Sequence, residues 1–280
     1  MASASVGAIE LDYRRQGEGP PLLMIMGMSG TYDHWDMRFL ELLARERELI
    51  LYDHRGVGRS SRAEAPFTIA ELAADALGLL EALDLPSVDV LGFSMGGMVA
   101  QELALAAPQR LRSLVLASTS AGGARSAHTA PEVLERLGGA MSSGDRQRAL
   151  RAAWEVNTAK PYSDDADAYE RFCAIGAERR VAMAVVLLQM RAIAEHDACE
   201  RLAALRTPTL VLHGTQDMMV PPANASALAD AMPGAQLQLM EGAGHLFFWE
   251  APERAAELVL EHLHSNSDRR LAAAEASRSH

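Results

Sequence analysis

The chain has 280 residues, of which 49% are hydrophobic and 22% charged, and its formal net charge is −11. This length and apolar content suit a globular protein with a substantial core, as one domain with an insertion or as two domains. The acidic balance argues against nucleic acids and anionic membrane surfaces as partners. No apolar run in the sequence is long enough for a membrane span.

The two cysteines, Cys173 and Cys199, lie in one predicted helical region and lack CxxC or zinc-ligand spacing. Free thiols in a reducing compartment are the default expectation, and a single disulfide between them is left open. The first residues lack the basic and apolar regions of a secretory signal, so a cytoplasmic location is expected. No spacing of His, Asp or Glu suggests a metal site, and we expect no cofactor.

Predicted strands and helices alternate through the first 121 residues. Alternating polar and apolar residues at 8–15 indicate a half-exposed antiparallel strand. Further strands are predicted at 22–26, 48–52, 88–91 and 111–118, and their apolar runs indicate burial on both faces. A helix is predicted at 35–45, and a capping box at Thr68 and Glu71 opens another that reaches residue 83. This order predicts a mostly parallel sheet with helices on both faces.

The pattern changes between residues 122 and 205, where no strand-like run is evident. Helices are predicted there at 131–141, 146–158, 166–173, 179–195 and 198–205. The alternation then resumes, with strands at 209–213 and 236–240 and helices at 222–232 and 252–264. We therefore predict a core domain in two parts (1–121 and 206–264), an inserted helical lid (122–205) and a flexible tail (265–280).

Ser94 stands at the centre of a Gly-x-Ser-x-Gly sequence between Gly92 and Gly96. A predicted strand precedes it and a helical pattern follows it, which is the setting of a nucleophile elbow. Small residues two positions from the serine let the strand and helix approach each other. The backbone N–H of Met95 is expected on the same side, at the positive end of the helix dipole. The alternative is an ordinary serine in a glycine-rich turn.

Two further polar residues are expected to join Ser94, because sites in open parallel sheets form where the strands end. Asp217 and His245 each follow a predicted strand, in the chain order expected of an acid and a base in this kind of sheet. His245 would accept the serine proton and return it to the leaving group, while Asp217 would orient the imidazole. Glu241 is a weaker candidate for the acid, since it precedes His245 by four residues in the same loop.

Met28 lies in the loop after the strand at 22–26, so its backbone N–H and that of Met95 are predicted to form an oxyanion hole. An apolar substrate pocket is predicted around this hole and in the lid, with core packing as the alternative for the lid side chains. The predicted pocket residues are Gly27, Phe93, Met141, Trp154 and Met190.

The glycine-rich loop at 53–60 raises the question of phosphate binding. It lacks the lysine of a P-loop and no helix follows it at once, so a structural role is favoured. His34 and His54 lie on loops near the expected mouth of the site, and His213 ends a strand. Structural or surface roles are favoured for all three histidines.

On these residues the chain resembles the α/β-hydrolase superfamily, over essentially all of residues 9–264. The resemblance is carried by the runs 92–101, 53–60, 213–217 and 242–245. It implies an α/β-hydrolase fold in which Ser94, Asp217 and His245 match the nucleophile, acid and base. The 94–101 run is similar to lid-bearing serine esterases and 3-oxoadipate enol-lactonases. Many relatives carry His-Gly before the oxyanion loop, where this chain has Met26-Gly27.

The first hypothesis is a serine carboxylic-ester hydrolase that acts on a small or medium ester or lactone through an acyl-enzyme. The same triad would serve carbon–carbon bond hydrolysis or cofactor-free perhydrolysis and haloperoxidation, and the sequence leaves these alternatives open. A non-catalytic ligand receptor is a third hypothesis, and the complete triad counts against it. The expected partner is a small-molecule substrate, and the expected state is a monomer or a homodimer.

Overall fold

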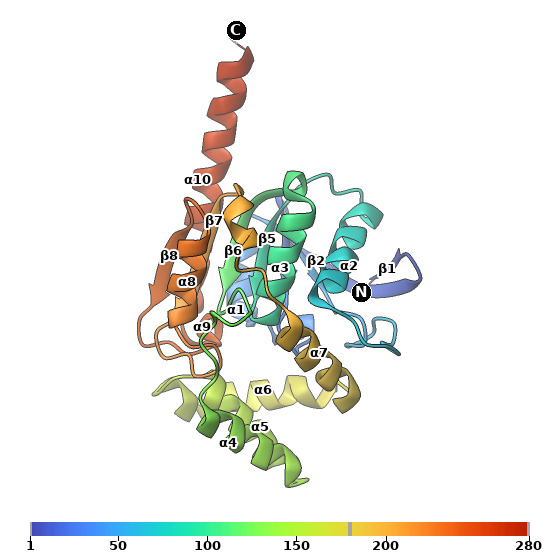
Figure 1. The fold of residues 1–280 in the computed structure, drawn as a ribbon, viewed down its shortest axis with the longest axis vertical. Helices are drawn as coiled ribbons and strands as arrows, with labels where there is room; N and C mark the ends of the chain where they lie inside the picture. Colours follow the sequence, from blue (N-terminus) through green and yellow to red (C-terminus); the bar gives the residue numbers. More distant parts are fainter. Residues whose placement is uncertain (1, 179–180, 279–280) are drawn as a thin grey trace.

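A computed structural model describes residues 2–178 and 181–278 of the chain. It shows a central sheet with helices on both faces and a group of helices beyond one end of the sheet (Figure 1). The predicted α/β-hydrolase architecture is confirmed. Within the described residues, no helix combines the length and the apolar character that crossing a membrane requires.

The described residues form one sheet of eight strands in the order β1-β2-β4-β3-β5-β6-β7-β8. β2 pairs antiparallel with both β1 and β4, and every later pair in this order is parallel. The carboxyl ends of β3 to β8 therefore share one edge, where a site is expected. The strands are β1 (Ala2–Val6), β2 (Ile9–Gln16), β3 (Pro21–Ile25), β4 (Glu48–Tyr52), β5 (Val88–Phe93), β6 (Leu111–Ala117), β7 (Thr209–Gly214) and β8 (Gln236–Met240).

Two hydrophobic layers lie on opposite faces of the sheet, and β3 shows how its apolar run serves both. Leu23 and Ile25 belong to one layer, and Leu22 and Met24 belong to the other. All four side chains are fully buried, and each contributes roughly 1.5–3 kcal/mol of transfer free energy. The first layer packs against α2 (Ile69–Ala82), α3 (Met95–Ala106) and α8 (Ala223–Ala231); the second packs against α1 (Met37–Leu43), α9 (Phe247–Glu250) and α10 (Pro252–Arg278).

The ends of some elements differ from the sequence predictions. The α1 helix begins at Met37 rather than 35, because the Asp36 side chain caps it by accepting a hydrogen bond from Phe39 N. The capping box predicted for α2 is confirmed. α10 continues as a helix to Arg278, where a frayed tail was expected from residue 265. Its alanine-rich end favours helix, and it projects away from the body in Figure 1. Residues 279–280 lie outside the described residues.

The segment 122–205, which we call the helical insertion, leaves the core after β6 and returns before β7. A β-bridge joins Gly122 to Asp197, and Ala198 N donates to Ala121 O at 2.8 Å, so the two ends of the insertion lie together. Only a short 3-10 turn (Arg201–Ala204) replaces the helix predicted at 198–205. The predicted helix start at 179 lies outside the described residues. The insertion contains α4 (Pro131–Ser142), α5 (Arg146–Asn157), α6 (Ala166–Glu178) and α7 (Met183–Glu195).

Candidate active site

Ser94 occupies a sharp turn between β5 and α3. Its backbone φ is 55° and ψ is −122°, a conformation that costs a non-glycine residue about 1–3 kcal/mol. The glycines on either side make this turn possible. A Cβ on Gly92 would lie 2.4 Å from Gly96 O, and a Cβ on Gly96 would lie 2.1 Å from Ile25 O. The sequence therefore supports the turn by keeping strand and helix in backbone contact.

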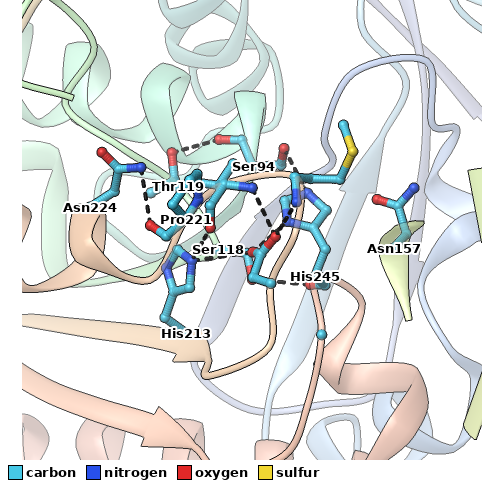
Figure 2. Close-up of polar contacts among 12 residues, drawn as sticks. Ser94, Ser118, Thr119, Asn157, His213, Pro221, Asn224 and His245 are labelled. Atoms are coloured by element: carbon cyan, nitrogen blue, oxygen red, sulfur yellow. Dashed lines mark hydrogen bonds and ion pairs between the residues drawn. The ribbon is translucent and has the colours of Figure 1, made fainter. Parts of the chain in front are cut away.

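Three side chains from separate loops meet at this edge of the sheet. His245 Nε2 lies 3.1 Å from Ser94 Oγ, and His245 Nδ1 lies 2.7 Å from Asp217 Oδ2 (Figure 2). An ionised carboxylate only accepts hydrogen bonds, so the imidazole proton belongs on Nδ1 and Nε2 is left to accept from the serine. His245 and Asp217 are both buried. The arrangement can transfer a proton between the hydroxyl and the imidazole.

The Asp217 carboxylate is surrounded by hydrogen-bond donors. Its Oδ1 accepts from Met219 N and Val220 N, each at 2.8 Å, and its Oδ2 lies 3.2 Å from His213 Nε2. Burial opposes ionisation of Asp217, but the charge and hydrogen bonds of His245 and His213 outweigh it and hold the pKa of this carboxyl below its ordinary value. His213 also lies 2.8 Å from Val220 O. The acid is thus fixed in both charge and orientation.

The loop after β6 holds the serine and histidine segments in place. Ser118 Oγ donates to His245 O at 3.0 Å, and Thr119 Oγ1 donates to Ser94 O at 2.7 Å (Figure 2). The sequence analysis missed both residues. Their position directly after a parallel strand, at the same edge as the other loops, is the signal that points to them.

A turn at residues 27–30 packs directly against the nucleophile. Gly30 N donates to Gly27 O at 3.3 Å, and a Cβ on Gly27 would lie 3.0 Å from the Ser94 Cβ. Among the residues that the structure describes, neither Met28 N nor Met95 N donates a hydrogen bond. Met95 N also opens α3, at the positive end of the helix dipole. Two unengaged donors beside Ser94 suit the binding of an oxyanion.

His54 supports this turn from the glycine-rich loop. Its Nε2 lies 3.0 Å from Met26 O, and burial lowers the pKa of the ring, so a neutral imidazole donates to the carbonyl. The loop itself wraps around Asp53, which accepts a hydrogen bond from Tyr32 N at 2.7 Å. A Cβ on Gly58 would lie 1.7 Å from Asp53 Oδ2, so glycine is needed there. These contacts support the structural role favoured for this loop.

The predicted pocket residues divide into two groups. Gly27 lies against Ser94, and the Phe93 ring lies 4.8 Å from the His245 ring between centroids. Trp154 is fully buried between the insertion and α9. Its Nε1 donates to Ser163 O at 3.0 Å, and its ring packs against Tyr162, Phe172 and Trp249.

The two pocket methionines lie on the surface of the insertion. Met141 is 45% exposed and Met190 is 49% exposed. Among the described residues, no hydrogen bond or ring contact joins Trp154, Met141 or Met190 to Ser94, His245 or Asp217. Exposure and packing do not test a role in substrate binding, so these three pocket residues remain predictions.

The helical insertion is attached to the loop that carries His245, residues 241–246, which we call the histidine loop. Leu246 N donates to Asn157 O at 2.8 Å. The Glu250 carboxylate accepts from Gly244 N at 2.9 Å and from Ala159 N at 3.2 Å. Burial raises the pKa of Glu250 to about 7. Sequence reasoning missed this bridge, because nothing in the run after His245 marks Glu250 as a half-buried acid that contacts the insertion.

In the described part of the chain, the two thiols are unpaired and the acidic side chains form no cluster of metal ligands. Cys173 and Cys199 are both free and half-buried. Within the described parts of the chain, no group of three or more His, Cys, Asp or Glu side chains is placed to hold a metal ion.

Fold and geometry together define a class: an α/β protein with serine, histidine and aspartate side chains joined at the sheet edge. The family model described as the alpha/beta hydrolase fold matches residues 20–252. This chain belongs to the α/β-hydrolase fold family, which confirms the resemblance inferred from sequence.

Individual relatives cover nearly the whole chain. The chain is 30% identical over 260 residues to an Azorhizobium caulinodans protein named as a carbamate hydrolase, RutD, with 93% of this chain and 97% of that protein covered. It is similar to a thermophilic esterase from Thermogutta terrifontis, with 27% identity, a TM-score of 0.78 and 95% and 98% of the two chains covered. It is also similar to the enol-lactonase from Burkholderia xenovorans LB400, with 25% identity, a TM-score of 0.82 and 94% and 100% covered.

Proposed function

We propose that this protein is a serine hydrolase that cleaves a small or medium carboxylic ester or lactone through an acyl-enzyme on Ser94. The observation that carries the proposal is the continuous hydrogen-bonded series from Ser94 Oγ through His245 to Asp217. The unengaged N–H groups of Met28 and Met95 beside the serine support it. A hydroxyl, a base, an oriented acid and an oxyanion site are the groups that acyl transfer needs.

In the first half of the reaction, Ser94 Oγ attacks the acyl carbon while His245 Nε2 takes the hydroxyl proton. Negative charge develops on the former carbonyl oxygen, where the N–H groups of Met28 and Met95 stabilise it. Loss of one such donor typically costs about 3–4 kcal/mol of the barrier. The tetrahedral intermediate then collapses, and the proton on His245 passes to the departing alcohol oxygen.

In the second half, a water molecule attacks the acyl-enzyme and gives its proton to His245. Collapse of this second intermediate releases the carboxylic acid and returns the proton to Ser94 Oγ. Asp217 stays ionised throughout, which agrees with the lowered pKa of its carboxyl. For a lactone, the alcohol and the acid leave as one ring-opened molecule.

The named relatives favour this substrate class and add a second candidate. An esterase and an enol-lactonase both align along nearly the full chain, and both names describe ester-bond cleavage. The relative named as a carbamate hydrolase favours carbamate cleavage as the second candidate. The same serine, base and oxyanion site would attack a carbamate carbonyl, so the choice depends on the pocket.

The test replaces the nucleophile and compares substrate classes. Ser94→Ala should lower the kcat for p-nitrophenyl acetate and butyrate by at least about 10³-fold, because no other group can form the acyl-enzyme. Ser143→Ala at the end of α4 is the matched control and should leave turnover unchanged. A fluorophosphonate should label wild-type Ser94, identified by mass spectrometry of the peptide.

The substrate panel adds a lactone, a carbamate, a diketone and peroxide with acetate. Faster turnover of the carbamate would favour the second candidate. Dominant turnover of the diketone or of peroxide would assign the triad to those reactions instead. Undiminished ester turnover by Ser94→Ala would overturn the mechanism.

A further inference from the structure

The buried side of α7 carries one amide side chain, Gln189. The neighbouring buried positions of this helix are Val185, Val186 and Ala192. Gln189 is fully buried. Burial of an amide is unfavourable unless hydrogen bonds compensate it. Its partner therefore indicates what the residue does.

That partner is the turn beside the nucleophile. Gln189 Oε1 accepts a hydrogen bond from Ser29 N at 2.9 Å. Ser29 follows directly on Met28, one of the two proposed oxyanion donors, and its φ is 56°. A backbone N–H can only donate, so the oxygen of the amide must face Ser29. The Gln189 Nε2 atom is left buried and has no hydrogen-bond partner among the described residues.

The conformation of this turn decides where the Met28 N–H points. The Met28 N–H belongs to the peptide whose carbonyl oxygen, Gly27 O, accepts the closing hydrogen bond of the turn from Gly30 N at 3.3 Å. A peptide is planar, so this N–H points away from that carbonyl and keeps its direction only while the turn stays closed. Positive φ at Ser29 marks one form of the closed turn and is unfavourable for a residue with a side chain. The acceptor supplied by Gln189 selects that form. The buried and unpaired Gln189 Nε2 costs free energy, and such an unsatisfied group in a folded protein calls for a functional explanation.

We propose that Gln189 is a positioning residue: through it, the helical insertion holds the turn at residues 27–30 in the conformation that presents the Met28 N–H to the oxyanion. The inference rests on the proposed function and deepens it. Gln189 touches Ser29, not the reacting atoms, so it acts through the Met28 N–H. Full stabilisation of the transition state then requires α7 to be seated on the core, and displacement of α7 leaves the turn free to relax.

The experiment compares variants that keep or remove the acceptor. Gln189→Met preserves length without an acceptor, and Gln189→Asn keeps the amide but falls short of Ser29; either serves if the other fails to fold. Gln189→Glu retains an acceptor oxygen at the right reach. Leu187→Ala, on the exposed side of the same helix, is the control. Thermal unfolding confirms that each variant is folded.

The expected signature is that of a weakened oxyanion hole. Gln189→Met and Gln189→Asn should lower kcat for p-nitrophenyl butyrate by about 10- to 100-fold, less than the complete loss of one donor, with KM changed less than about threefold. Affinity for a trifluoromethyl ketone, which mimics the tetrahedral intermediate, should fall by the same factor. Gln189→Glu should recover most of the kcat, and Leu187→Ala should match the wild-type protein.

Two different results would distinguish failure of this inference from failure of the proposed function. Failure of a fluorophosphonate to label wild-type Ser94 would remove the proposed function and the role of Gln189 with it. Normal labelling of the wild-type protein, with unchanged kcat and inhibitor affinity in Gln189→Met, would overturn only the role of Gln189. Equal losses in Gln189→Met and Gln189→Glu would also overturn it, because they would indicate packing rather than an acceptor.

Discussion

Two carboxyl groups contact the loop that carries His245, the buried one of Asp217 and the half-buried one of Glu250. Asp217, after β7, accepts two backbone N–H groups from its own loop. Glu250, in α9, also accepts two backbone N–H groups, one from the histidine loop and one from the helical insertion. Their hydrogen bonds to the backbone are alike in number. Their pKa values nevertheless move in opposite directions: that of Asp217 is lowered, and that of Glu250 is raised to about 7.

The difference comes from the charged neighbours. Burial raises the pKa of both carboxyl groups, but Asp217 faces the imidazoles of His245 and His213, which reverse the effect. For Glu250, burial acts in the same direction as the negative charge of Asp217. Burial and backbone hydrogen bonds therefore do not fix the ionisation of a carboxyl group, whereas nearby ionisable partners do.

The largest effect is expected from Asp217→Asn. The amide cannot stabilise the imidazolium and favours the wrong tautomer of His245, so kcat for p-nitrophenyl butyrate should fall about 10⁴-fold. Glu250→Gln is the matched control, because it removes the other carboxyl that contacts the loop of His245, and its kcat should stay within about tenfold of wild type. Comparable losses in the two variants would contradict the separation of roles.

A smaller effect, on stability, is expected from Glu250→Gln as the pH varies. Between pH 4.5 and about 7 the folded protein keeps a proton on Glu250 that the unfolded chain has released, so the free energy of unfolding of the wild type falls as the pH rises. The total change is up to about 3 kcal/mol. The glutamine variant should lack this fall.

Urea denaturation of both proteins at several pH values between 4.5 and 7.5 provides the measurement. Other titrating groups are common to the two proteins, so the difference in unfolding free energy isolates Glu250. That difference should shift in favour of Glu250→Gln as the pH rises. A difference that stays constant across the range would show that Glu250 ionises normally in the folded protein.

The smallest effect is expected from His213, the second imidazole at Asp217. His213→Leu removes a donor that lies 3.2 Å from Asp217 Oδ2 and leaves Val220 O without its partner. Loss of a hydrogen bond to a charged group costs about 1.5–3 kcal/mol, so kcat/KM should fall at least about tenfold. His213→Gln keeps an N–H donor and should lose less. Equal kcat/KM in the two variants would mean that His213 only fills space.

Local pattern predicted most of the sheet. The apolar run at 22–26 corresponds to β3, whose side chains are buried on both faces. A continuous apolar run of this length is typical of a strand in a parallel sheet that is covered on both sides. The antiparallel strand β1 escaped prediction because its residues, Ala2–Val6, are mostly small or polar. Its place in the sheet depends on pairing with β2. Such pairing joins two different segments, which the pattern within one segment cannot show.

The pocket predictions for the insertion show where the sequence pattern is ambiguous. A tryptophan and exposed methionines in a helical segment fit either a pocket or core packing, because the periodicity is the same for both. The orientation of the insertion on the core decided that Trp154 is interior and that Met190 faces solvent. The Gln189 contact was likewise beyond prediction, since it joins residues 160 positions apart.

The amino-acid sequence by itself determined the alternating strands, the glycines that permit the turn at Ser94, and the chain order of serine, acid and histidine. These depend on local backbone sterics and on periodic burial, which each short segment carries within itself. Only the tertiary structure decided which carboxyl is ionised and how the helical insertion meets the turn at Met28. Those properties depend on distances between groups that are remote in sequence, and the electrostatic and hydrogen-bonding energies exist only once folding has set these distances.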